Sequence, residues 1–124
     1  MALIKATSSP SFELPFLSVT GMAAPSRGAQ ETCVWRLRLA PGAPPVPHAV
    51  DREEIFVALT GQARVQLGAD QFDLAAGDTL IVPSGQTFAL GNPHSEAFVA
   101  MAILPVGGQA CMPEGVPFVP PWAQ

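Results

Sequence analysis

Apolar and polar residues alternate with a period of two along much of this chain. The clearest case is segment 32–40, TCVWRLRLA, in which one face is apolar and the other carries Arg36 and Arg38. Such alternation is typical of a β-strand with one buried face. Further strands are predicted at 53–61, 63–67, 71–76, 79–83, 86–90 and 96–105.

Segment 53–61, EEIFVALTG, is apolar at nearly every position, which predicts a strand buried on both faces. The turns between strands carry glycine and aspartate, as in GAD (68–70) and Gly77-Asp78. Helical periodicity is absent, and 14 prolines and 11 glycines interrupt the chain. Short strands separated by turn residues predict an all-β sandwich or barrel.

The 124 residues are predicted to form one domain. Residues 1–30 are expected to supply one or two edge strands and a loop, residues 31–105 the barrel core, and residues 106–124 a proline-rich arm. The arm is either a loose tail or an extended segment whose Phe118 and Trp122 dock on the barrel or on a partner subunit, because large aromatic side chains gain most from burial.

Composition narrows the classes of function. Hydrophobic residues make up 48% of the chain and charged residues 13%, against roughly 25% in an average protein. So few surface charges favour a covered surface, most simply a homodimer. The net charge of −4 and the scattered basic residues argue against nucleic-acid binding. No apolar run is long enough for a membrane-spanning helix.

The sequence also allows a prediction of the cellular location of the protein and of the oxidation state of its two cysteines. The N-terminal segment has no long apolar core and does not read as a signal peptide. Cys33 and Cys111 lie far apart and are expected to be free thiols. Together these features predict a cytoplasmic protein.

Two segments carry a more specific pattern. The first runs from Gly42 to Gly61 and the second from Gly77 to Asn92, and their spacing resembles the paired motifs of the cupin superfamily, Gx5HxHx3-4Ex6G and Gx5PxGx2Hx3N. The matched positions are Gly42, His48, Glu54, Gly61, Gly77, Pro83, Gly85 and Asn92. This resemblance implies a single-domain double-stranded β-helix, or jelly-roll barrel.

The chain departs from the cupin motifs at two positions that usually bind a metal. In the superfamily, two histidines and the glutamate of the first motif, with the histidine of the second, hold one ion. Here Val50 and Phe88 replace two of the histidines, so only His48 and Glu54 remain. Catalytic zinc sites keep three protein ligands, so a tightly held cofactor is not expected. Any divalent metal, whether Fe, Mn, Ni or Zn, would bind through His48 and Glu54. His94 is interpreted as a surface histidine rather than a replacement ligand.

If the barrel forms, alternation places a mostly apolar group of side chains at its interior or mouth. The expected ligand-pocket residues are Val50, Phe56, Phe88 and Leu90, beside His48 and Glu54. Burial should raise the pKa of Glu54 unless a cation pairs with it. His48 and Glu54 form a candidate catalytic dyad for proton transfer, or a buried pair that only stabilises the barrel.

Three functions remain open from the sequence. The first is a metal-free module that binds a small organic molecule. The second is an enzyme, either of the cupin dioxygenase or isomerase type or a metal-free acid/base catalyst using His48 and Glu54. The third is an interaction protein that works through its dimer surface and its arm.

Overall fold

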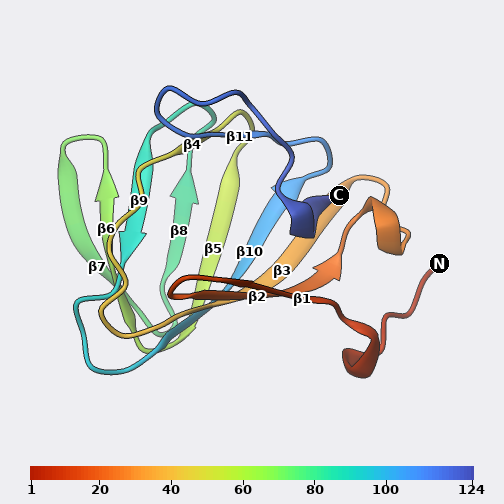
Figure 1. Ribbon diagram of the computed structural model, residues 1–124, viewed down its shortest axis with the longest axis horizontal. Coiled ribbons are helices and arrows are strands. Elements are labelled where there is room, and N and C mark those ends of the chain that lie inside the picture. The colour runs from red at the N-terminus through yellow and green to blue at the C-terminus, as the bar shows by residue number, and fades with distance from the viewer.

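The computed structural model describes residues 1–124 and consists mainly of β-strands, as predicted (Figure 1). The strands are β1 (Ser11–Leu14), β2 (Leu17–Ala23), β3 (Thr32–Leu39), β4 (Ala49–Val50), β5 (Glu54–Thr60), β6 (Gln62–Leu67), β7 (Asp70–Ala75), β8 (Thr79–Val82), β9 (Phe88–Gly91), β10 (Phe98–Pro105) and β11 (Ala110–Cys111). Three short 3-10 turns complete the elements: η1 (Ala6–Ser8), η2 (Pro25–Arg27) and η3 (Pro121–Ala123). None of the helical segments has the length and apolar character required to span a membrane.

The strands form two antiparallel layers. The larger sheet has the order β1-β2-β3-β10-β5-β8, and the smaller sheet has the order β7-β6-β9. The pair β11-β4 extends the smaller layer, because His48, just before β4, exchanges backbone hydrogen bonds with Phe88 of β9. The all-β jelly-roll prediction is therefore confirmed.

The core lies between the two layers and is built from alternate residues of each strand. In β3 the apolar face is buried while Arg36 and Arg38 are exposed, as predicted. Ala102 of β10 lies in register between Trp35 of β3 and Phe56 of β5. A small side chain between two large rings leaves room for both, which is how a close-packed interior accommodates aromatic residues.

Strand β5 buries one face only, so the prediction that both of its faces are buried is wrong for the single chain. Glu54, Phe56 and Ala58 are buried, whereas Ile55 and Val57 are half-buried. The reason is that the outer face of the larger sheet has no second layer of this chain over it.

The outer face of the larger sheet nevertheless carries an apolar row. Val34, Ile103, Ile55 and Ile81 lie in register on four neighbouring strands. Ile81 keeps 55% of its surface exposed. We call these four residues the outer apolar row.

Gly61, the last glycine of the first motif, ends β5 in a left-handed conformation with φ of 74°. A Cβ atom at this position would collide with the carbonyl oxygen of Ala97. The turn from the larger to the smaller sheet therefore depends on glycine for two reasons, its backbone conformation and the close approach of another segment.

The C-terminal arm, residues 106–124, crosses the upper end of the barrel in Figure 1 and ends beside β2 and β3. The ring of Trp122 packs against Phe12 and Trp35, with centroids 6.0 and 6.3 Å apart. Phe118 exchanges backbone hydrogen bonds with Ala110, although its side chain remains 42% exposed. The arm thus docks on its own barrel, chiefly through Trp122.

Candidate functional site

Glu54 is the most unusual polar residue of the barrel interior. It begins β5, faces inward opposite Val82, and keeps only 4% of its surface exposed. No hydrogen bond or ion pair joins its carboxyl group to another side chain. Burial disfavours the charged form and raises the pKa of Glu54 to about 8. The carboxyl group is therefore mostly protonated at neutral pH.

His48 lies near the same interior but does not bond to Glu54. Its Nδ1 is 3.0 Å from the carbonyl oxygen of Val46. Because a carbonyl oxygen only accepts, Nδ1 carries the proton and donates, which leaves Nε2 as the basic nitrogen of the neutral ring. The imidazole packs against Phe88 with ring centroids 4.4 Å apart. The structure thus does not join the predicted dyad by a hydrogen bond.

The four predicted ligand-pocket residues belong to the core or pack against it. Val50, Phe56 and Phe88 are each at most 4% exposed, and Leu90 is partly buried against the core cluster. Phe88 contacts Phe56 across the barrel at 5.7 Å between centroids, and it contacts His48 on its other side. Its ring therefore contacts both the imidazole and a side chain of β5, the strand that carries Glu54.

The donor set does not fit a metal ion. The structure contains no group of three or more His, Cys, Asp or Glu side chains that could hold one. His48 and Glu54 supply two donors at most, and the position from which the second motif usually donates is occupied by the ring of Phe88. Stable zinc and iron sites need at least three protein ligands.

A second polar cluster lies on the outer side of the smaller sheet and was not found from the sequence. Arg64 of β6 donates from Nε to Oδ1 of Asp73 on β7 at 2.7 Å, and Nε2 of His94 lies 3.8 Å from the same oxygen. The pKa of Asp73 is lowered, and the largest cause is the hydrogen bond from Arg64. The alternation of Gln62, Arg64 and Gln66 with buried residues is the sequence signal for an outward polar face.

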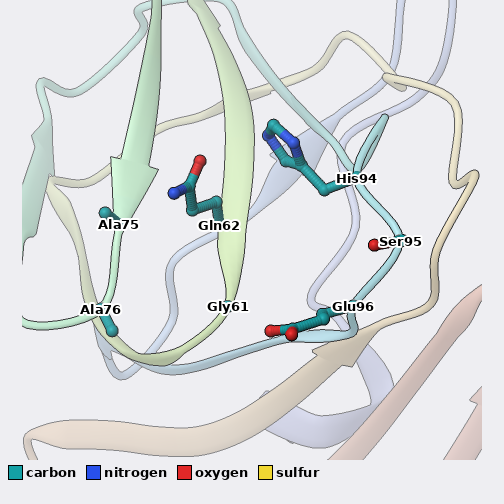
Figure 2. Close-up of a pocket in the computed structure, with 7 residues that line it drawn as sticks. All are labelled: Gly61, Gln62, Ala75, Ala76, His94, Ser95 and Glu96. Carbon is teal, nitrogen blue, oxygen red and sulfur yellow. The ribbon is translucent and has the colours of Figure 1, made fainter.

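Two surface cavities flank this cluster. One, of about 380 Å³, is lined by Gln62, His94, Ser95 and Glu96 together with glycine and alanine (Figure 2). Figure 2 shows His94, Ser95 and Glu96 following one another along one loop, with Gln62, Ala75 and Ala76 to the left of that loop. The second cavity, of about 290 Å³, lies between β6 and β9 and the loop before β4.

The cysteines and the charged loop after β4 carry no comparable site. Cys33 is buried, and desolvation raises the pKa of its thiol. Cys111 is also a free thiol and bonds to the carbonyl oxygen of Gly115. Asp51 accepts hydrogen bonds from Ser84 and from the backbone of Gln109, so it joins loops rather than facing the interior.

Many solved structures are similar to this fold. The chain is similar to the polyketide cyclase RemF from Streptomyces resistomycificus, with 14% identity over 87% of this chain and 81% of that one and a TM-score of 0.76. It is similar to the Momordica charantia 7S globulin, with 17% identity, coverage of 91% and 38%, and a TM-score of 0.75. It is also similar to a variant of oxalate decarboxylase from Bacillus subtilis, with 17% identity, coverage of 82% and 28%, and a TM-score of 0.74.

The chain spans well under half the length of the globulin and of the decarboxylase, and these low identities establish the fold alone. No curated protein sequence matches the chain. The model of the cupin domain family, in contrast, matches residues 35–104, more than half of the chain. This match, the paired motifs and the two-layered barrel together show that the chain belongs to the cupin domain family.

Proposed function

We propose that this cupin protein binds a small, mostly apolar organic molecule in its barrel without a tightly held metal. The observation that carries the proposal is the nearly buried carboxyl group of Glu54, which has no side-chain hydrogen-bond partner and is not fully sealed from solvent, unlike Nε2 of His94 and Nε1 of Trp122. Buried polar groups normally have partners, so an unpartnered one in an interior is a candidate contact for a ligand.

The protonation state of Glu54 defines the ligand chemistry. With its pKa raised to about 8, the group presents one O–H donor and one carbonyl acceptor at neutral pH. The matching ligand carries a carbonyl or hydroxyl oxygen on an apolar body, as in small ketones, lactones and phenols. An anionic group is disfavoured there because the surrounding apolar side chains would not stabilise its charge.

Access to the interior leads past the C-terminal arm. Ala110 and Cys111 of the arm pair in register with Val50 and Ala49 of β4, and this pairing holds the arm at the end of the barrel. Binding in the interior therefore requires the arm to move away from this end of the barrel. The exposed side chain of Phe118 gives the arm little apolar anchorage at this point.

A second copy of the chain is the proposed partner. The outer apolar row is partly exposed in the single chain, since Ile81 is exposed and the other three residues are half-buried, and the larger sheet has no other cover on that side. Pairing two such faces would bury this row on both copies, which is the usual arrangement of a symmetric dimer.

One observation favours an enzyme as the second candidate. A carboxyl group with a pKa of about 8 can release and recover a proton near neutral pH, which suits a general acid or base. In this alternative Glu54 acts on the substrate directly. His48 takes no part through Glu54, since its Nδ1 proton is directed to Val46.

The test of the binding function is a thermal-shift screen of small phenols, lactones and aliphatic ketones. We expect at least one compound to raise the melting temperature, and Glu54→Leu to weaken its binding about tenfold, the effect of one lost hydrogen bond. Glu53→Leu is the matched control, because Glu53 is exposed beside it. Absence of any saturable binding, or equal binding by both variants, would contradict the proposal.

A further inference from the structure

The smaller surface cavity, of about 290 Å³, lies on the outer side of the smaller sheet and is separate from the barrel interior. Its floor includes Gly91 of β9, which pairs in register with Arg64 of β6. A Cβ atom at Gly91 would lie 3.2 Å from the backbone nitrogen of Pro45. Because glycine occupies this position, the loop packs closely over β9 and no side chain fills the space beside Arg64.

The guanidinium group of Arg64 is held at one edge and free at the other. Its Nε donates to Asp73 at 2.7 Å, and no hydrogen bond involves Nη1 or Nη2. Nε2 of His94 lies 3.8 Å from Oδ1 of Asp73, and His94 lines the larger cavity rather than this one. A guanidinium fixed through Nε presents its two terminal nitrogens as a planar pair of donors.

Apart from Arg64, the lining of the cavity is uncharged and combines Gln66, Gln71 and Asn92 with glycine, alanine and proline. Gln66 and Gln71 face each other in register and both line it, and neither amide has a hydrogen-bond partner in the protein. No acidic residue lines it, although the chain has a net charge of −4. The larger cavity beside it is different, because Glu96 lines that one.

We infer that this cavity binds the carboxylate of a small hydroxylated acid, with Arg64 holding the carboxylate and the amides of Gln66 and Gln71 holding hydroxyl groups. Paired guanidinium donors match a carboxylate, and amides both donate to and accept from hydroxyls. The volume of about 290 Å³ lies just below the usual range of ligand pockets, roughly 300–1,000 Å³, so one small molecule fits. Asp73 beside Arg64 disfavours a second negative charge, so a carboxylate is preferred over a phosphate dianion.

The experiment is a titration of the isotope-labelled protein by amide NMR at pH 7, using galacturonate, galactose and inorganic phosphate as probes. We expect galacturonate to shift the amide signals of Gly91, Gln66 and Gln71 saturably, with a dissociation constant of about 1–10 mM. Galactose, which lacks the carboxylate, should bind at least about tenfold more weakly.

Two arginine variants complete the test. Arg64→Gln should weaken galacturonate binding about tenfold or more, because it removes the charged donor pair. Its fold should survive, since the Arg64–Asp73 pair is about 40% exposed and contributes little to stability. Arg38→Gln on the larger sheet should change nothing.

Three results would overturn the inference. They are an absence of saturable shifts with galacturonate, equal binding by Arg64→Gln and the unmodified protein, and tighter binding of phosphate than of galacturonate.

Discussion

Replacing Glu54 by glutamine is expected to flatten the dependence of stability on pH between about 4.5 and 8. In the folded protein the pKa of Glu54 is raised from 4.5 to about 8. Across this window the unfolded chain has released the proton while the folded chain still holds it, so the free energy of unfolding falls as pH rises. At about 1.4 kcal/mol for each pH unit, the total loss has an upper bound of about 5 kcal/mol. Glutamine cannot ionise, so the Glu54→Gln variant should show none of this loss of stability.

The measurement is urea unfolding at several pH values across the window, for the unmodified protein, Glu54→Gln and Glu53→Gln. Glu53 is exposed next to Glu54, so its replacement controls for the loss of one acidic residue. The difference between the curves of the unmodified protein and Glu54→Gln should grow steadily towards pH 8. Parallel curves for the two proteins would refute the assignment of a desolvated, unpartnered carboxyl group.

Four further outcomes follow from the structure. Gly61→Ala should lower the free energy of unfolding by about 3 kcal/mol or more, because the added methyl group meets the carbonyl oxygen of Ala97. Gly77→Ala is the control, since Gly77 also has positive φ but open space around it, and it should cost about 1 kcal/mol. Equal losses of stability in chemical denaturation would contradict the steric argument. Trp122→Ala should cost about 2–3 kcal/mol through the lost ring contacts, and a change within error would show that the arm is not docked. Elemental analysis of protein purified without added metal should find well under one equivalent of Fe, Mn, Ni or Zn, and a stoichiometric ion would refute metal independence. Ile103→Glu should convert a dimer to a monomer in sizing experiments, and a monomer before substitution would remove the proposed partner.

Most of the larger elements could be predicted from the sequence because antiparallel strands with one buried face show a period of two. Segment 32–40 illustrates this, since β3 covers Thr32–Leu39 with the predicted apolar face inward. The two-residue strands β4 and β11 were missed, because they are too short for alternation and lie among prolines and turns. Whether both faces of a strand are buried depends on the layers that pack against its sheet. The sequence of β5 does not show that its outer face lacks such a layer, so the prediction of two buried faces was wrong.

The candidate site was predictable in part. The motif spacing indicated that Glu54 would face inward and that burial would raise its pKa, and both features are present. The sequence did not reveal that His48 turns Nδ1 towards Val46, because this depends on a side-chain rotation. The pairing of Arg64 with Asp73 depends on the register of β6 and β7, which only the folded sheet defines.

The docking of η3 also bears on how the barrel assembles during synthesis. Arg27, which follows β2, donates to the carbonyl oxygen of Trp122, a residue 95 positions later in the chain. Until that later segment emerges, the ring of Trp35 and the inner side of the first hairpin lack their apolar cover. Nascent chains should therefore be most prone to aggregate, or to recruit a chaperone, in the interval before residues 121–123 are made, since such long-range closure is slow and exposes hydrophobic surface.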